Sequence, residues 1–304
     1  DMAPLLARDA VETGQVWQRT RLIPISGNSN GVKIPYVDET SRVDGSRWGG
    51  ISVYWADEAE EKTKSKPKLG RLELSLKKVI GLVYLTDEVI EDAAALGAIV
   101  QQGFTEEMGF ALDDSAIRGT GAGQPLGILN APATVSVAKE SSQAAATILF
   151  ENVNKMWDRL PGRSQLNSVW FINVACGKEL RRMVIPVKNV AGTENVGGSA
   201  VYLPPGGVSG SPYGTLFGRP VIPIEQCAAL GTVGDIILAD MSQYLRLEKG
   251  GMRSASSIHV RFIYDESVFR FVMRVDGQPG WKSALTPFKG SDTLSPFVTL
   301  ATRA

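Results

Sequence analysis

The chain has 304 residues, which is long enough for one large or two medium domains with buried cores. Its 32 basic and 32 acidic residues cancel, and this balance argues against a dedicated nucleic-acid-binding protein, which typically carries a basic excess. The two cysteines, Cys176 and Cys227, lie in apolar surroundings without metal-ligand spacing, so we expect buried, reduced thiols and no metal site. No stretch is apolar over enough residues to predict a membrane span.

The first third of the chain predicts an arm followed by a hairpin. Residues 1–35 are polar and carry turn formers at 27–31 (GNSNG), which favours an extended arm. Apolar residues then alternate with polar ones on both sides of a charged stretch at 57–70, at Ile51, Val53 and Trp55 and again at Leu72, Leu74 and Leu76. This period of two predicts a long antiparallel hairpin whose tip is far longer than a tight turn.

A long helix is the next element. Thr86 is a candidate N-cap for a short helix, because Asp87 and Glu88 follow it in the first turn. Apolar residues then recur at three- and four-residue steps from Leu96 to Ser115. They predict a helix of roughly 20 residues, about 30 Å long, that ends at Arg118 before Gly119.

The remaining elements mix helices with scattered strands. We expect helices at 149–160 and 178–183, a long irregular loop at 190–214, and strands at 168–175, 219–224, 235–239, 259–264 and 268–275. Strands and helices do not alternate regularly, so the fold class is α+β.

The glycine run at 118–130, RGTGAGQPLGILN, raises the question of a phosphate-binding loop. A dinucleotide fingerprint follows a strand and opens a helix, whereas this run follows a helix, and no Gly-Lys-Ser/Thr completes a Walker loop. The favoured interpretation is a structural turn after the long helix, made by Gly119, Gly121, Gly123, Pro125 and Gly127. A phosphate-using enzyme is the remote alternative.

The sequence offers few candidate catalytic residues. His259 is the only histidine and lies in a predicted strand, so neither a nucleophilic triad nor a zinc site is indicated. The acidic pairs Glu106-Glu107 and Asp113-Asp114 are expected on solvated or inter-subunit faces, and Asp265-Glu266 in a turn. We predict no catalytic, cofactor or metal site.

The hairpin tip mixes both signs of charge, which suits contact with a neighbouring subunit better than contact with nucleic acid. The residues predicted to make this inter-subunit contact are Glu58, Glu60, Glu61, Lys62, Lys64, Lys66, Lys68 and Arg71.

The order of these elements from 66 to 130, with the turn at Gly119, Gly121, Pro125, Gly127 and Ile128, resembles the major capsid proteins of tailed bacteriophages, which have the Hong Kong 97-type fold. The segment 214–247, with Gly218, Pro220, Val221 and Pro223, resembles the axial domain of that fold. The resemblance implies an N-terminal arm at 1–35, an E-loop hairpin at 45–85, a first peripheral part at 86–176 with a spine helix at about 95–118, an axial domain at 177–252, and a peripheral return at 253–304.

The same resemblance implies partners and a location. Copies would form hexamers and pentamers and close into an icosahedral shell around double-stranded DNA, held without sequence specificity on the inner face. A portal protein at one vertex, a decoration protein and a maturation protease acting upstream are further implied partners. The location implied is the virion capsid, assembled in the host cytoplasm. The start at Asp1 is compatible with a protease-generated end or with a sequence that represents part of a longer chain.

Two alternatives stay open within this resemblance. An encapsulin-like nanocompartment would share the fold but hold an enzyme as cargo. Some members crosslink a lysine of the hairpin to an asparagine on a peripheral strand beside an acid. Lysines are present at 62–68 and acids at Asp265 and Glu266, but the strand 256–264 has no asparagine, so we expect non-covalent stabilisation.

Overall fold

The computed structural model describes residues 14–58, 64–86, 88, 96–188, 195–205 and 212–303. The chain divides into two compact units, each assembled from three separate segments. Unit 1 contains residues 1–34, 72–130 and 244–280, and unit 2 contains residues 35–71, 131–243 and 281–304. Residues 131–176 and 281–304 therefore share a unit with 177–243.

Unit 1 is built on a five-stranded sheet in which the long strand β15 is central. Its strands are β1 (Arg21–Ile23), β4 (Lys77–Thr86), β13 (Tyr244–Glu248), β14 (Arg253–Arg261) and β15 (Glu266–Pro279). β15 pairs antiparallel with β4, β13 and β14, while β1 adds to β13 in parallel. Two 3-10 turns flank these strands, η1 (Trp17–Arg19) and η5 (Phe262–Tyr264).

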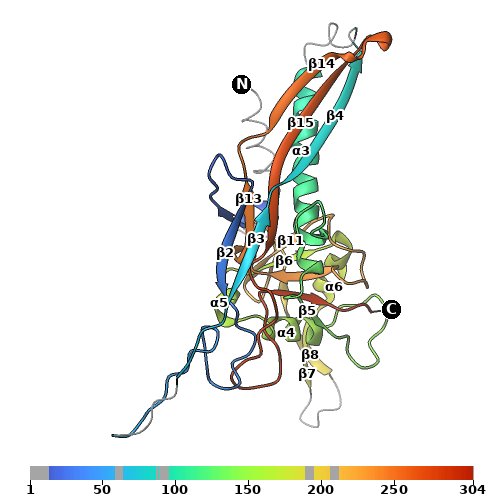
Figure 1. Cartoon of the computed structure of the whole chain (residues 1–304). Helices are drawn as coiled ribbons and strands as arrows, with labels where there is room; N and C mark the ends of the chain where they lie inside the picture. The colour runs from blue at the N-terminus through green and yellow to red at the C-terminus, as the bar shows by residue number, and fades with distance from the viewer. Residues whose placement is uncertain are drawn as a thin grey trace. The chain divides into compact units, whose positions relative to one another are not determined.

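The long helix α3 (Leu96–Arg118) packs on one face of this sheet (Figure 1). The rings of Phe104 and Phe271 lie 4.3 Å apart, and Met108 belongs to the same buried cluster. Gly81 on β4 permits this close approach, because a Cβ at that position would lie 2.4 Å from the Phe104 ring. Helix and sheet therefore share one small apolar core.

Unit 2 is built on a seven-stranded mixed sheet in the order β5-β16-β12-β6-β11-β10-β9. These strands are β5 (Val135–Val137), β16 (Phe297–Leu300), β12 (Ile236–Ala239), β6 (Val169–Ile172), β11 (Arg219–Pro223), β10 (Thr215–Leu216) and β9 (Tyr202–Leu203). Unit 2 also contains three helices, α4 (Phe150–Asp158), α5 (Gly162–Gln165) and α6 (Gly177–Arg182), and two 3-10 turns, η3 (Val174–Cys176) and η4 (Met241–Gln243). A further 3-10 turn, η2 (Ile128–Asn130), follows α3 in unit 1.

The core of unit 2 forms because its central strands are apolar on both faces. Every residue of β6, β12 and β16 is buried, as runs without polar alternation predict for interior strands. Val153 and Met156, one helical turn apart on α4, pack into the cluster that contains Trp170. Asn152 begins this helix by accepting a hydrogen bond from the Leu149 amide at 3.0 Å.

Two short ladders complete the fold. β2 (Gly31–Val37) pairs with β3 (Leu69–Ser75), and β7 (Val184–Lys188) pairs antiparallel with β8 (Asn195–Ala200). The first ladder corrects the predicted hairpin: β3 forms as expected, but it pairs with β2, which begins in the segment expected to be an extended arm, and not with residues 51–55. Residues 52–57 form no strand, so the alternation of Ile51, Val53 and Trp55 does not mark one.

Several sequence-based expectations are confirmed. The long helix ends at Arg118 as predicted, and helices form near 149–160 and 178–183 with strands at 169–172, 219–223 and 236–239. The last predicted pair is confirmed in part: β15 contains the strand expected at 268–275, but β14 ends at Arg261, and residues 262–264 of the strand expected at 259–264 form η5. Asp265, which follows η5, has a positive φ of 50°. The irregular loop expected at 190–214 is wrong in part, because β8 and β9 lie within it. Thr86 is the last residue of β4, and the helix expected after it lies largely outside the described residues.

Candidate assembly site

The long loop at 38–68 connects β2 to β3 and is held at its base by backbone contacts. The Asp38 amide donates to the Lys68 carbonyl at 2.9 Å, and the Lys68 amide donates to the Gly49 carbonyl at 2.8 Å. Gly49 has a φ of +73°, and a Cβ there would lie 2.7 Å from the Lys68 oxygen. The two sides of the loop therefore run close together where it leaves the strands.

The charged residues predicted to contact a neighbouring subunit lie on or beside this loop. Glu58, Lys64, Lys66 and Lys68 are exposed, and so is Arg71 on β3. Glu60, Glu61 and Lys62 lie outside the described residues. Their contact with a second copy stays a prediction.

Sequence reasoning missed the apolar part of the same loop. The side chains of Val53 and Trp55 are 93% and 102% exposed, and Trp48 and Tyr54 are exposed as well. The alternation at 51–55 predicts one strand of a hairpin, although the acidic residues that follow it are typical of a loop. Exposed aromatic side chains on a projecting loop are typical of a protein-binding surface.

The glycine run forms a tight turn directly after α3. The Gly119 amide donates to the Ser115 carbonyl at 3.0 Å, and the Gly127 amide donates back to the Gly119 carbonyl at 2.8 Å. A Cβ at Gly119 would lie 2.1 Å from the Pro125 oxygen, so only glycine fits there. Gly121 and Gly123 have φ of +81° and +73°, which glycine adopts without strain.

Lys77 fixes the middle of this turn. Its ammonium donates to the Gly121 carbonyl at 2.9 Å and to the Gln124 carbonyl at 2.7 Å, and it pairs with Asp276 at 3.1 Å. The carbonyl of Leu126 accepts a hydrogen bond from the Tyr244 hydroxyl at 3.0 Å. The turn therefore ties α3 to β4, β13 and β15.

This geometry disfavours the phosphate-binding interpretation. A phosphate loop presents free backbone amides to its ligand. Here the amides of Gly119, Gly121 and Gly127 donate to protein carbonyls, and the Leu126 amide donates to Gly277 at 2.8 Å. The lysine of the turn is likewise directed to carbonyls and a carboxylate.

Asp113 anchors the N-terminal segment to α3. Its carboxylate accepts hydrogen bonds from the amides of Gln15 at 2.7 Å, Val16 at 3.1 Å and Trp17 at 2.8 Å. Burial raises the pKa of Asp113 above its ordinary value, and the three amides oppose this shift. The expectation that the pair Asp113-Asp114 lies on a solvated or inter-subunit face is therefore wrong for Asp113, which is buried.

Trp17 completes this anchor. Its side chain is fully buried, its indole donates to Glu248 at 2.9 Å, and its carbonyl accepts from Arg246 at 2.9 Å. The ring of Tyr244 meets it edge-on at 6.3 Å. The segment at 14–19 is therefore packed against α3 and β13, where the sequence predicted an extended arm.

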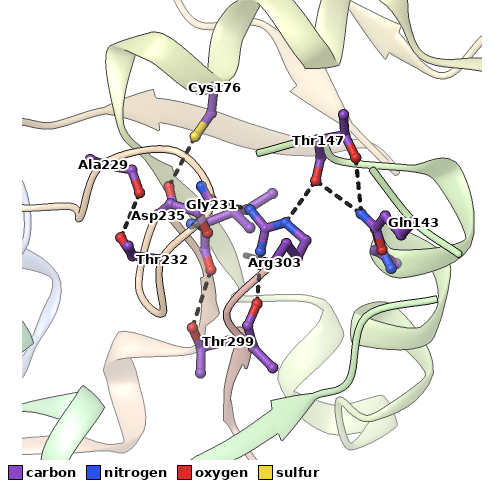
Figure 2. A network of polar contacts seen from close by, with 12 residues as sticks. Gln143, Thr147, Cys176, Ala229, Gly231, Thr232, Asp235, Thr299 and Arg303 are labelled. Carbon is purple, nitrogen blue, oxygen red and sulfur yellow. Dashed lines mark hydrogen bonds and ion pairs between the residues drawn. The ribbon is translucent and has the colours of Figure 1, made fainter. Parts of the chain in front are cut away.

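A buried ion pair anchors the C-terminal segment within unit 2 (Figure 2). Arg303 pairs with the carboxylate of Asp235, and both side chains are fully buried. Arg303 also donates to the carbonyls of Thr147 at 2.7 Å and Ala301 at 3.0 Å. Burial raises the pKa of Asp235, while the amides of Gly231 and Ile236 and the guanidinium favour its charged form. No sequence motif indicates this pair, because its members are 68 residues apart.

The two cysteines and the histidine, which are the residue types most often used in metal sites and nucleophilic catalysis, lie in different environments. Cys176 and Cys227 are buried, as predicted, and neither forms a disulfide in the described part of the chain, while burial raises the pKa of Cys176 to about 12. His259 is exposed on β14. Among the residues that the structure describes, no cluster of acidic, histidine and cysteine side chains could hold a metal ion, and no helix is long and apolar enough to cross a membrane.

Comparisons with solved structures show the same fold in capsids and phage proteins. The capsid of a native GTA particle is 15% identical with a TM-score of 0.67, and the alignment covers 97% of this chain and 90% of that one. A protein of Microbacterium phage Oxtober96 is 13% identical with a TM-score of 0.61, covering 95% and 90%. The mature capsid of bacteriophage PhiM1 is 8% identical with a TM-score of 0.55, covering 95% and 87%.

No curated protein matches the sequence. The sequence does match a family of shell proteins over residues 2–290, which is nearly its whole length. The chain belongs to the phage capsid family.

Proposed function

We propose that this chain is the major capsid protein of a tailed bacteriophage and that its copies self-assemble into an icosahedral shell. The family match over residues 2–290 is the observation that carries this proposal. The fold agrees with it, since structural neighbours at 95% coverage or more are capsids or phage proteins.

The finer parts of the proposal follow from the family resemblance. Hexamers and pentamers would form the shell, which encloses double-stranded DNA in the virion after assembly in the host cytoplasm. A portal protein, a decoration protein and a maturation protease are proposed partners. The role is structural, and the loop at 38–68 with its exposed tip is the proposed contact between subunits.

The surface of the loop supports a role in assembly. Val53 and Trp55 are too exposed to contribute to the core of their own unit. Burying apolar area of this kind contributes roughly 25 cal/mol per Å², so one loop per subunit stabilises a contact that closed symmetry repeats around the shell.

Electron microscopy of the purified protein tests the proposal. Uniform closed shells are expected, and their heat or detergent disruption should release nuclease-sensitive DNA when particles are isolated from infected cells. A protein that stays monomeric at all concentrations, with no particle in the cell extract, contradicts it. An encapsulin-like shell would contain a protein cargo in place of DNA, and the capsid neighbours do not favour it.

A further inference from the structure

A groove of about 360 Å³ over strands β4, β14 and β15 of unit 1 is strongly basic. Among the described residues that line it, none is acidic and five are basic, namely Lys78, Lys249, Arg253, Arg270 and Arg274. We call this surface the basic groove. Lys249 is partly engaged, because its ammonium donates to the Ser29 carbonyl at 2.7 Å and to Asn30 at 3.2 Å. The other four cations are the ones that a ligand would meet.

Strand register places these four side chains on one face of the sheet (Figure 1). Arg270 and Arg274 flank Val272 on β15, and residues two positions apart on a strand point to the same side. Lys78 lies opposite Arg274, and Arg253 lies opposite Val272. Because directly paired residues share a side, the four cations surround Val272.

The other face of the same sheet is the one that α3 covers. Phe271 and Met273, which alternate with the arginines on β15, are buried, and Phe271 packs in one cluster with Met108 of α3. The helix therefore covers the apolar side and leaves the basic groove open within unit 1, where Arg270 is exposed.

The charge of the basic groove is not neutralised by the described part of the chain. Its four cations other than Lys249 form no ion pair with a described carboxylate. Lys78 and Arg274 lie directly across two strands, and a like-charge pair at such positions destabilises a sheet. A bound anion would remove this repulsion.

The arrangement of charge fits a short chain of phosphates. Arginine is suited to phosphate, because its planar guanidinium donates two parallel hydrogen bonds to phosphate oxygens. One phosphate group carries about two negative charges at pH 7, which balances only half of the four cations. Arg270 and Arg274 are four residues apart on an extended strand, so their Cα atoms are separated by about 13 Å. Both the charge and the separation favour two or three linked phosphates over one.

The surface beyond the groove limits the length of this ligand. Leu82 and Tyr84 follow Ile80 on the same face of β4, and all three are about half exposed. The guanidinium of Arg261 lies over the Tyr84 ring, but it is paired with Glu266 at 3.1 Å. A nucleic-acid backbone that followed the strands would therefore place phosphates over apolar groups, whereas a short anion stays among the cations.

We propose that the basic groove binds an oligophosphate of two or three linked phosphates, held by Lys78, Arg253, Arg270 and Arg274. The ligand is defined by its phosphate chain, which is either inorganic or part of a nucleoside triphosphate. Its binding stabilises the sheet of unit 1, because a ligand that binds only the folded state opposes unfolding. The inference goes beyond the proposed shell-forming function and does not depend on it, since the residues of the groove belong to one chain and one unit.

Isothermal titration calorimetry of the full-length chain with sodium tripolyphosphate tests the site. We expect one ligand per chain, bound at least tenfold more tightly than orthophosphate. The double variant Arg270→Gln and Arg274→Gln should weaken the binding of tripolyphosphate at least tenfold. The matched double variant Arg163→Gln and Arg181→Gln removes two exposed arginines of unit 2, and it should bind as the wild type does.

A charge-conserving variant separates a built site from a diffuse positive charge. Arg270→Lys with Arg274→Lys keeps both charges but removes the two planar forks. Its affinity for tripolyphosphate should lie between those of the wild type and of the glutamine variant. Circular dichroism should show the same fold for all of these variants.

The repulsion within the groove gives a second measurement that needs no change of ligand. Lys78→Gln removes one member of the like-charge pair, so the variant without ligand should unfold at a higher urea concentration than the wild type. It should also gain less stability from tripolyphosphate. A variant that is less stable than the wild type and gains as much from tripolyphosphate would contradict the proposal.

Further ligands identify the anion. Equal affinities for tripolyphosphate and adenosine triphosphate would show that the phosphate chain suffices, and tighter binding of the nucleotide would identify a nucleotide as the ligand. Either result supports the site if the glutamine variant loses it. Equal binding of orthophosphate and tripolyphosphate that the glutamine variant retains would mean an adventitious ion only and would overturn the proposal.

A polymer is the remaining outcome. Single-stranded DNA or a glutamate-rich peptide that binds through these arginines at least tenfold more tightly than tripolyphosphate would overturn the proposal in favour of a polymer surface. Failure of the wild type to form shells would contradict the proposed function but leave these affinities as expected, so the two failures are distinguishable.

Discussion

Substituting Gly119 by alanine should damage the turn after α3 far more than the same change four residues later. The new Cβ would lie 2.1 Å from the Pro125 oxygen and 2.4 Å from the Ser115 oxygen. Both are backbone atoms that already accept hydrogen bonds in the turn, so no side-chain rotation relieves the clash. Forced overpacking of this kind costs about 3 kcal/mol, which is roughly a hundredfold change in the local folding equilibrium.

Gly123→Ala is the matched control. Gly123 has a φ of +73°, but a Cβ there meets nothing within 4 Å. Only the left-handed backbone strain remains, which costs about 1 kcal/mol. The two variants make the same chemical change in one loop, so their difference of about 2 kcal/mol isolates the steric contact.

Hydrogen exchange of peptides from the last turns of α3 measures this difference locally. Exchange in the Gly119→Ala variant should be faster than in the Gly123→Ala variant by about tenfold or more. Equal exchange in the two variants would refute the reasoning, because it would mean that the backbone around Gly119 relaxes freely. Saturable binding of a nucleotide that either substitution removes would revive the phosphate-loop interpretation.

Four further predictions concern other features of the protein. Asp113→Ala should destabilise the anchor of residues 14–19 by about 2 kcal/mol, because the buried amides of Val16 and Trp17 lose their acceptor, and limited proteolysis should then cut this segment faster than in Asp114→Ala. Burial raises the pKa of Asp113 above its ordinary value of 3.8, so its contribution to the unfolding free energy should fall as the pH rises from 3.8 through the folded-state pKa. Asp113→Asn should remove that part of the pH slope in urea unfolding, and an unchanged slope would contradict the assignment. Cys176, with a pKa of about 12, should resist thiol alkylation in the native protein and react after unfolding, and labelling without unfolding would disprove its burial. Particles boiled in denaturing detergent should run as single subunits, whereas a ladder of covalent oligomers would show crosslinking.

The sequence by itself determined the elements whose signal is local. The long helix, its end at Arg118 and the strands near 169–172 and 236–239 follow from apolar periodicity and from glycine, which act over a few residues. The order of those elements also carries the resemblance to the capsid family, which the family match over residues 2–290 supports.

Tertiary structure decided which segments meet. The sequence at 51–55 alternates like a strand, but β3 finds its partner in β2, and Val53 and Trp55 remain exposed on the loop. A period of two indicates only that alternate side chains point to the same side, so it cannot distinguish a buried strand face from an exposed loop surface.

The partners of the buried charged residues were also decided by the tertiary structure. Asp113 meets amides about 97 residues away, and Asp235 meets Arg303 across 68 residues. Lys78 and Arg274 likewise meet only because β4 and β15 pair in the register that places them opposite one another. Chain segments far apart in sequence create these surroundings, because burial and charge pairing depend on distance in space, which local sequence patterns do not encode.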